Sequence, residues 1–266
     1  MQHGGSRFGT KMYQSSKRDK DSSETGQRLV DWFAAQPGTR IAEQERESLA
    51  AMVSDLFGYQ LLQLGELGAD TAYLANCPIS RKTLVSHRVT TGSASASVIV
   101  GEGCRLPVAS DSVDAVLLIH TLDFSPDPHQ VLREVERVLI PEGRVIVVGF
   151  NPYSLWGLWR LFGRWRGAIP WCGRFLSYPR LNDWLTLLGF RVERMDVMEF
   201  RPPTRKGRFE MIENVGRRVW PMLAGVYVVR AVKRVSRVTP IRQHWSRLRA
   251  VGPRAIEPTV REIKDV

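Results

Sequence analysis

The polar residues of this 266-residue chain that could do chemistry stand directly after short apolar runs. His120, Thr121 and Asp123 follow the apolar run 114–120. A histidine titrates near neutral pH, so His120 could act as a general base or orient a substrate. It could equally pack beneath the next helix as a structural residue. The chemistry expected at this point is proton transfer or substrate positioning, and the sequence leaves both interpretations open.

A second group of residues combines aromatic rings with positive charge. Residues 155–176 hold four tryptophans and four arginines, namely Trp156, Trp159, Trp165, Trp171, Arg160, Arg164, Arg166 and Arg174. Rings and guanidinium groups can stack on or pair with an aromatic or anionic acceptor. They can also seat a protein on an anionic membrane surface. A third interpretation is a helix whose aromatic side chains pack on a sheet.

Alternating strands and helices must position these residues. Apolar runs bounded by turn residues predict five strands, at 59–64, 83–86, 97–100, 114–120 and 144–150. The amphipathic spacing of apolar residues predicts helices near 27–33, 41–57, 127–139 and 181–188. Two last strands, at 190–200 and 225–233, are expected to be antiparallel neighbours. Strand–helix alternation of this kind predicts an α/β fold with a doubly wound sheet, which binds its ligands at the carboxyl ends of the strands.

Positive charge is concentrated towards the end of the chain. Residues 1–200 carry 22 Lys and Arg against 22 Asp and Glu, whereas residues 201–254 carry 14 against 2. This asymmetry indicates an anionic partner for residues 201–254, such as RNA, a membrane surface or an acidic protein, or else a solvated basic tail. We expect a disordered segment over 1–26, one domain over 27–233 with an insertion at 151–180, and a basic tail over 234–266.

The stretch 98–152 resembles the class I S-adenosylmethionine-dependent methyltransferases of the type 11 group. The matching features are Glu102, the pair Leu106-Pro107, Asp114 at the start of a strand, the helical segment 132–139 and the turn 141–143. The resemblance implies a Rossmann-like sheet of seven strands, mostly parallel with an antiparallel last strand. It also implies S-adenosyl-L-methionine as cofactor, methyl transfer to a small-molecule or lipid-like acceptor, and a lid formed by the 151–180 insertion.

The resemblance places the cofactor in the loops after the first three strands. Transferred residue by residue, it implies cofactor contacts for Gly65, Glu66, Leu67, Gly68, His87, Glu102, Gly103 and Cys104. Glu102 would face the adenine amino group; the alternative is a solvated loop carboxylate. His87 stands where the family has a carboxylate for both ribose hydroxyls, and a neutral imidazole accepts only one such hydrogen bond.

The first loop departs from the family pattern. The usual Gly-x-Gly-x-Gly turn reads Gly65-Glu66-Leu67-Gly68-Ala69, and Gln63 replaces an acidic residue in the strand before it. These departures support an alternative function, a catalytically inactive member of the fold that binds RNA or a protein through its basic C-terminus. An RNA methyltransferase is a third interpretation, although no RNA-binding module is recognisable.

Several other functions are disfavoured by the sequence. It lacks the Gly-Lys-Ser/Thr of a phosphate loop, and its glycines fit a nicotinamide dinucleotide fingerprint even less well. Three cysteines without a CxxC pair argue against a disulfide framework and a structural zinc site, so we expect no metal and a reducing, cytoplasmic environment. No signal peptide or membrane-spanning run is expected.

Overall fold

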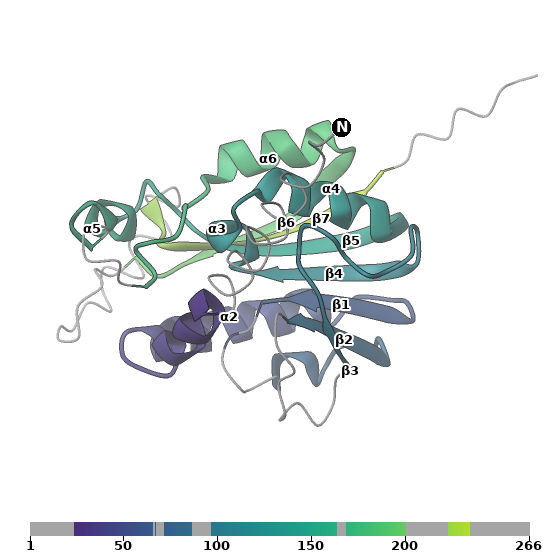
Figure 1. Cartoon of the computed structure of the whole chain (residues 1–266), viewed down its shortest axis with the longest axis horizontal. Coiled ribbons are helices and arrows are strands. Elements are labelled where there is room, and N and C mark those ends of the chain that lie inside the picture. Colours follow the sequence, from purple (N-terminus) through teal and green to yellow (C-terminus); the bar gives the residue numbers. More distant parts are fainter. Residues whose placement is uncertain are drawn as a thin grey trace, which may run out of the picture. The chain divides into compact units, whose positions relative to one another are not determined.

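A seven-stranded sheet forms the centre of the molecule, as seen in the computed structural model (Figure 1). The structure describes residues 24–65, 67, 72–86, 97–163, 169–200 and 223–234. The strands follow the order β3-β2-β1-β4-β5-β7-β6. Their bounds are β1 (Gln60–Leu64), β2 (Arg81–Ser86), β3 (Ser97–Val100), β4 (Val113–Ile119), β5 (Leu139–Phe150), β6 (Phe190–Met198) and β7 (Val226–Lys233).

The pairing of these strands confirms the predicted sheet. Strands β1 to β5 pair in parallel, whereas β7 lies between β5 and β6 and is antiparallel to both. Strand β5 begins at Leu139, five residues before the predicted start, because Leu139 already pairs with Val113 ahead of an irregularity in the β4–β5 ladder. The predicted turn at 141–143 lies within this irregular part, where Glu142 has a φ of 65°.

Helices cover both faces of the sheet. The helices are α2 (Gly38–Val53), α3 (Thr121–Phe124), α4 (Pro128–Val138), α5 (Leu155–Gly163) and α6 (Tyr178–Leu187), with a 3-10 turn η1 (Ala72–Leu74) and a further helix over residues 24–33. In Figure 1, α4 and α6 lie on one face and α2 on the other. The two faces form two apolar cores, to which successive residues of β4 contribute alternately.

Two helix boundaries differ from the sequence prediction. The first helix begins at residue 24, three residues inside the segment expected to be disordered, and the Gln27 amide donates a hydrogen bond to Asp31 across one of its turns (3.1 Å). Helix α2 spans Gly38–Val53 instead of 41–57. It stops early because the chain must turn through Gly58, at a φ of +142°, to enter β1. Residues 1–23 and 235–266 lie outside the described residues.

The start of the site-bearing strands is fixed by Asp114 of β4. Its carboxylate accepts hydrogen bonds from the backbone N–H groups of Tyr59 (2.9 Å) and Gln60 (2.8 Å). This family-matching aspartate therefore has a structural role, since it aligns β1 with β4. None of the helices that the structure describes is long and apolar enough to cross a membrane.

Candidate functional site

The loop after β1 is organised by Gln63, the residue that replaces the acidic side chain of the family. The Gln63 amide donates to the Gly65 carbonyl (2.9 Å) and accepts from the Tyr73 hydroxyl (3.0 Å). Gly65 has a φ of +84°, which glycine adopts without strain. Glutamine thus positions this turn through an uncharged amide, which needs no counter-charge in a buried position.

Leu67 occupies the position of the family's second glycine, and its side chain is buried in the same apolar core as α2. Its carbonyl accepts a hydrogen bond from Arg46 of α2 (2.8 Å). The Leu67 side chain therefore packs in the core beside α2. Glu66 and Gly68, which the sequence also placed in the site, lie outside the described residues, as does His87.

The loop after β3 brings Glu102, Gly103 and Cys104 towards the ends of β1 and β4. All three residues are half-buried. A Cβ placed on Gly103 would lie 3.3 Å from the Leu64 side chain and 3.7 Å from that of Thr121. The structure therefore brings Gly103 to the point where Gly65 and Thr121 meet. Burial raises the pKa of the Cys104 thiol, so Cys104 is protonated at neutral pH.

Helix α4 holds the β3–β4 loop in this position. The Glu134 carboxylate accepts from the backbone N–H of Leu106 (3.0 Å). Arg137 donates to the carbonyls of Leu106 (3.1 Å) and Val108 (2.9 Å) and pairs with Glu134 (2.9 Å). The hydrogen bond from Arg137 lowers the pKa of Glu134, so the pair stays ionised. The Leu-Pro segment that matched the family is thus fixed by charged groups of a helix some thirty residues away.

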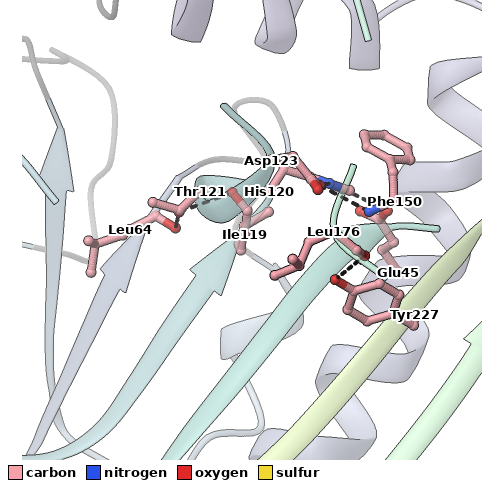
Figure 2. Close-up of polar contacts among 9 residues, drawn as sticks. All are labelled: Glu45, Leu64, Ile119, His120, Thr121, Asp123, Phe150, Leu176 and Tyr227. Carbon is pink, nitrogen blue, oxygen red and sulfur yellow. Dashed lines mark hydrogen bonds and ion pairs between the residues drawn. The ribbon is translucent and has the colours of Figure 1, made fainter. Parts of the chain in front are cut away.

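His120 lies at the carboxyl end of β4, between two carboxylates (Figure 2). Its Nε2 is 2.9 Å from Glu45 of α2, and its Nδ1 is 3.0 Å from Asp123 of α3. The ring stacks on Phe150 at 4.2 Å between centroids and is fully buried. Its backbone has a φ of 50°, an uncommon value for a residue with a side chain.

This surrounding determines the protonation of His120. Burial alone would lower the pKa of His120, but attraction to Glu45 and the hydrogen bonds with Asp123 and Glu45 outweigh it and raise the pKa to about 9. At neutral pH the ring is an imidazolium with both N–H groups engaged, so no nitrogen is left to accept a proton. The geometry argues against the general-base interpretation and favours the structural alternative.

Asp123 connects this histidine to the segment that follows α5. The Asp123 carboxylate accepts from the backbone N–H of Phe150 (3.0 Å), and its carbonyl accepts from the N–H of Arg174 (2.6 Å). Nearby, the Tyr227 hydroxyl of β7 donates to the Leu176 carbonyl (2.9 Å), as Figure 2 shows. The buried polar network therefore joins α2, the end of β4, the end of β5 and the segment 174–176.

Comparison with known proteins agrees with this arrangement. Residues 57–147 match the family described as a methyltransferase domain. The solved structure of a SAM-dependent methyltransferase, possible histamine N-methyltransferase, from Thermotoga maritima resembles this fold with a TM-score of 0.55 at 20% identity, over 77% of this chain and 93% of that chain. Residues 57–147 therefore resemble a methyltransferase domain, and the sheet has the fold of the class I S-adenosylmethionine-dependent methyltransferases.

Curated relatives of the chain include an uncharacterized protein and a named methyltransferase. The chain is 40% identical over 138 residues to the uncharacterized protein YafS of Escherichia coli strain K12. The aligned region covers 52% of this chain and 55% of that protein. It is 27% identical over 134 residues to a demethylmenaquinone methyltransferase of Chlamydia pneumoniae, and this aligned region covers 45% of the chain and 57% of that protein. The chain thus spans about half the length of the curated relatives it matches.

Glu45 is a residue of the buried network that the sequence did not predict. It lies on α2, four residues after Ile41 and four before Leu49, and all three are fully buried. A carboxylate on the apolar stripe of an amphipathic helix signals a buried partner. The signal was present in the sequence, but it could not identify His120, which lies 75 residues further along the chain.

The raised pKa of His120 predicts a pH dependence of stability. A group whose pKa is higher in the folded state stabilises fully below its unfolded value of 6.5, and this contribution is lost as the pH rises through about 9. We expect the free energy of unfolding to fall by about 3 kcal/mol across this window. Urea denaturation at several pH values measures it, and a His120→Leu variant should lack the part of the slope near pH 9, where the imidazolium loses its proton. Parallel pH profiles of the two proteins would contradict the assignment.

Proposed function

We propose that the chain is an active S-adenosylmethionine-dependent methyltransferase of the cytoplasm that acts on a small-molecule or lipid-like acceptor. The observation that carries this proposal is the convergence of Gly65, Gly103 and Thr121 at the carboxyl ends of β1 and β4, with Glu102 beside them. Doubly wound sheets bind ligands at this edge. The three cysteines are free, which is consistent with a reducing compartment.

The residues at this edge fit the proposed cofactor. Glu102 offers a half-buried carboxylate that can accept from the adenine amino group. Gly65 permits a close approach of the backbone. S-adenosylmethionine supplies a methyl group already activated on a sulfonium, so the protein needs to orient the acceptor and exclude water.

The departures from the family pattern do not require an inactive protein. Gln63 forms its hydrogen bonds with Gly65 and Tyr73, and Leu67 is packed in the core. Both side chains are therefore accommodated by contacts within the fold. Since both ring nitrogens of His120 are engaged by Glu45 and Asp123, we assign His120 no part in proton transfer.

The acceptor class is supported by the surroundings of the site and by relatives. Trp156 is fully buried and stacks on Phe150 and Trp171, so packing accounts for this part of the 151–180 insertion. Trp171 and Phe124 are only partly buried and offer aromatic surface to an acceptor. Relatives named demethylmenaquinone methyltransferase suggest a quinone-like acceptor. An anionic partner for residues 201–254 is a separate proposal, since most of them lie outside the described residues.

Calorimetric titration with S-adenosylmethionine and S-adenosylhomocysteine tests the proposal. We expect micromolar binding, and Glu102→Ala should weaken it about tenfold because a hydrogen bond to a charged group is lost. The matched control is Glu47→Ala, which removes an exposed carboxylate of α2. Thermal unfolding of each variant verifies the fold.

Two results would contradict it. Unchanged affinity in Glu102→Ala would remove Glu102 from the site. An absence of binding up to millimolar cofactor would favour the inactive scaffold, and titration with RNA would then become the next experiment.

A further inference from the structure

Helix α5 exposes an apolar face. Leu155, Leu158 and Trp159 are 45%, 56% and 47% exposed, and Tyr153, just before the helix, is 68% exposed. The spacing of the three helical residues, i, i+3 and i+4, places them on one side of the helix. Large apolar side chains gathered in this way on a surface mark a contact with a partner or a membrane.

The orientation of this face is fixed by the opposite side of α5. Trp156 is fully buried against Phe150 and Trp171. A Cβ placed on Gly157 would lie 1.8 Å from the Pro152 carbonyl oxygen, so the helix is in close contact with the preceding turn. The Ser154 hydroxyl accepts from the N–H of Gly157 (3.2 Å) and begins the helix. The helix cannot rotate to bury its exposed residues without breaking these contacts.

The segment that contains this face carries charge of a single sign. From residue 151 to residue 182 the sequence holds five arginines and no aspartate or glutamate. Arg174 is exposed, and Arg160 lies over the Phe175 ring at 5.1 Å while donating to the Trp171 carbonyl. Exposed Leu, Trp and Tyr next to arginines are the composition of helices that lie in the interface of anionic bilayers.

We propose that Tyr153 and α5 dock the protein on an anionic lipid bilayer. Helix α5 follows β5 almost directly, and Figure 1 shows it beyond the carboxyl ends of β4 and β5. Docking through its exposed face turns that edge of the sheet towards the lipid, where the helix would lie in the headgroup region with its apolar side chains inserted. A lipid-like acceptor would then reach the site from the membrane. The docking itself requires no cofactor, so it can fail or succeed independently of methyl transfer.

Sedimentation with vesicles tests this surface in the full chain. The probes are vesicles of phosphatidylcholine alone and of phosphatidylcholine with phosphatidylglycerol, at physiological salt and without cofactor. We expect binding to the anionic vesicles, and a Leu155→Ser/Leu158→Ser/Trp159→Ser variant should bind them about 100-fold more weakly. The matched control is Phe57→Ser/Tyr59→Ser/Leu187→Ser, which removes three exposed apolar side chains outside α5 and should bind like the parent.

Tryptophan fluorescence gives a second, local measurement. Bromine-labelled lipid quenches indole rings that enter the bilayer, so the parent protein should be quenched on binding and Trp159→Phe should lose most of that quenching. Equal binding of the α5 variant and the parent would overturn the proposal and assign vesicle binding to another basic segment. No binding of the parent to anionic vesicles would also overturn it. If the parent forms a dimer and the α5 variant is a monomer, the exposed face of α5 contacts a second copy of the chain and the proposal is overturned.

Discussion

Replacing His120 by alanine is expected to lower the free energy of unfolding by about 4 kcal/mol. The substitution leaves Glu45 and Asp123 buried without the imidazolium that lies between them. It also opens a cavity against Phe150, on which the ring stacks. One oxygen of each carboxylate already has no hydrogen-bond partner, so little remains to compensate a second loss. Urea denaturation at pH 6.5 measures the change.

A second substitution separates the effect of the lost imidazolium charge on stability from the effect of the cavity. Adding Glu45→Gln to His120→Ala removes one uncompensated charge and should recover about 1–2 kcal/mol, because a buried amide costs less than a buried carboxylate. The control is His129→Ala, which removes an exposed histidine of α4 that contacts Trp184 and should cost less than about 1 kcal/mol. A cost below about 1 kcal/mol for His120→Ala itself would show that His120 is not an imidazolium held between Glu45 and Asp123.

The sheet could be predicted because its signals are local. The apolar run at β4 is continuous, as a strand with helices on both faces requires, and both cores receive its side chains. Asp127 caps α4 by accepting from the N–H of Gln130 (3.1 Å), and aspartate is a residue type that favours this position. Gly189, at a φ of +80°, follows the end of α6, and glycine is the residue that most often ends a helix in this conformation.

The details of the site could not be predicted, because they depend on contacts between distant segments. Sequence alone showed Gln63 and Leu67 as departures that weaken a cofactor loop. Only the fold shows that the Gln63 amide forms hydrogen bonds with Tyr73 and Gly65. It also shows that the Leu67 side chain packs in the core with α2. The role of His120 was left open for the same reason, since Glu45 comes from a helix that precedes the whole sheet.

Gly65→Ala is expected to cost about 3 kcal/mol of stability and to weaken cofactor binding at least about tenfold. A Cβ at this position would lie 2.1 Å from the Ile119 carbonyl oxygen, and the φ of +84° is unfavourable for alanine. Ile119 pairs with Val148 in β5, so its backbone cannot move without distorting the centre of the sheet. The strain must instead displace the end of β1, where Thr121 donates to the Leu64 carbonyl (2.8 Å), shown in Figure 2.

Comparison with a second glycine distinguishes this local strain from a general intolerance of alanine. At Gly26, in the helix over residues 24–33, a Cβ meets nothing within 4 Å. Gly26→Ala should therefore raise stability by about 0.5–1 kcal/mol and leave cofactor affinity unchanged. Titration of Gly65→Ala at a temperature where it is folded then isolates the loop. Unchanged affinity in the folded variant would mean that the turn after β1 only joins strand to helix and that the cofactor is held by the loop after β3.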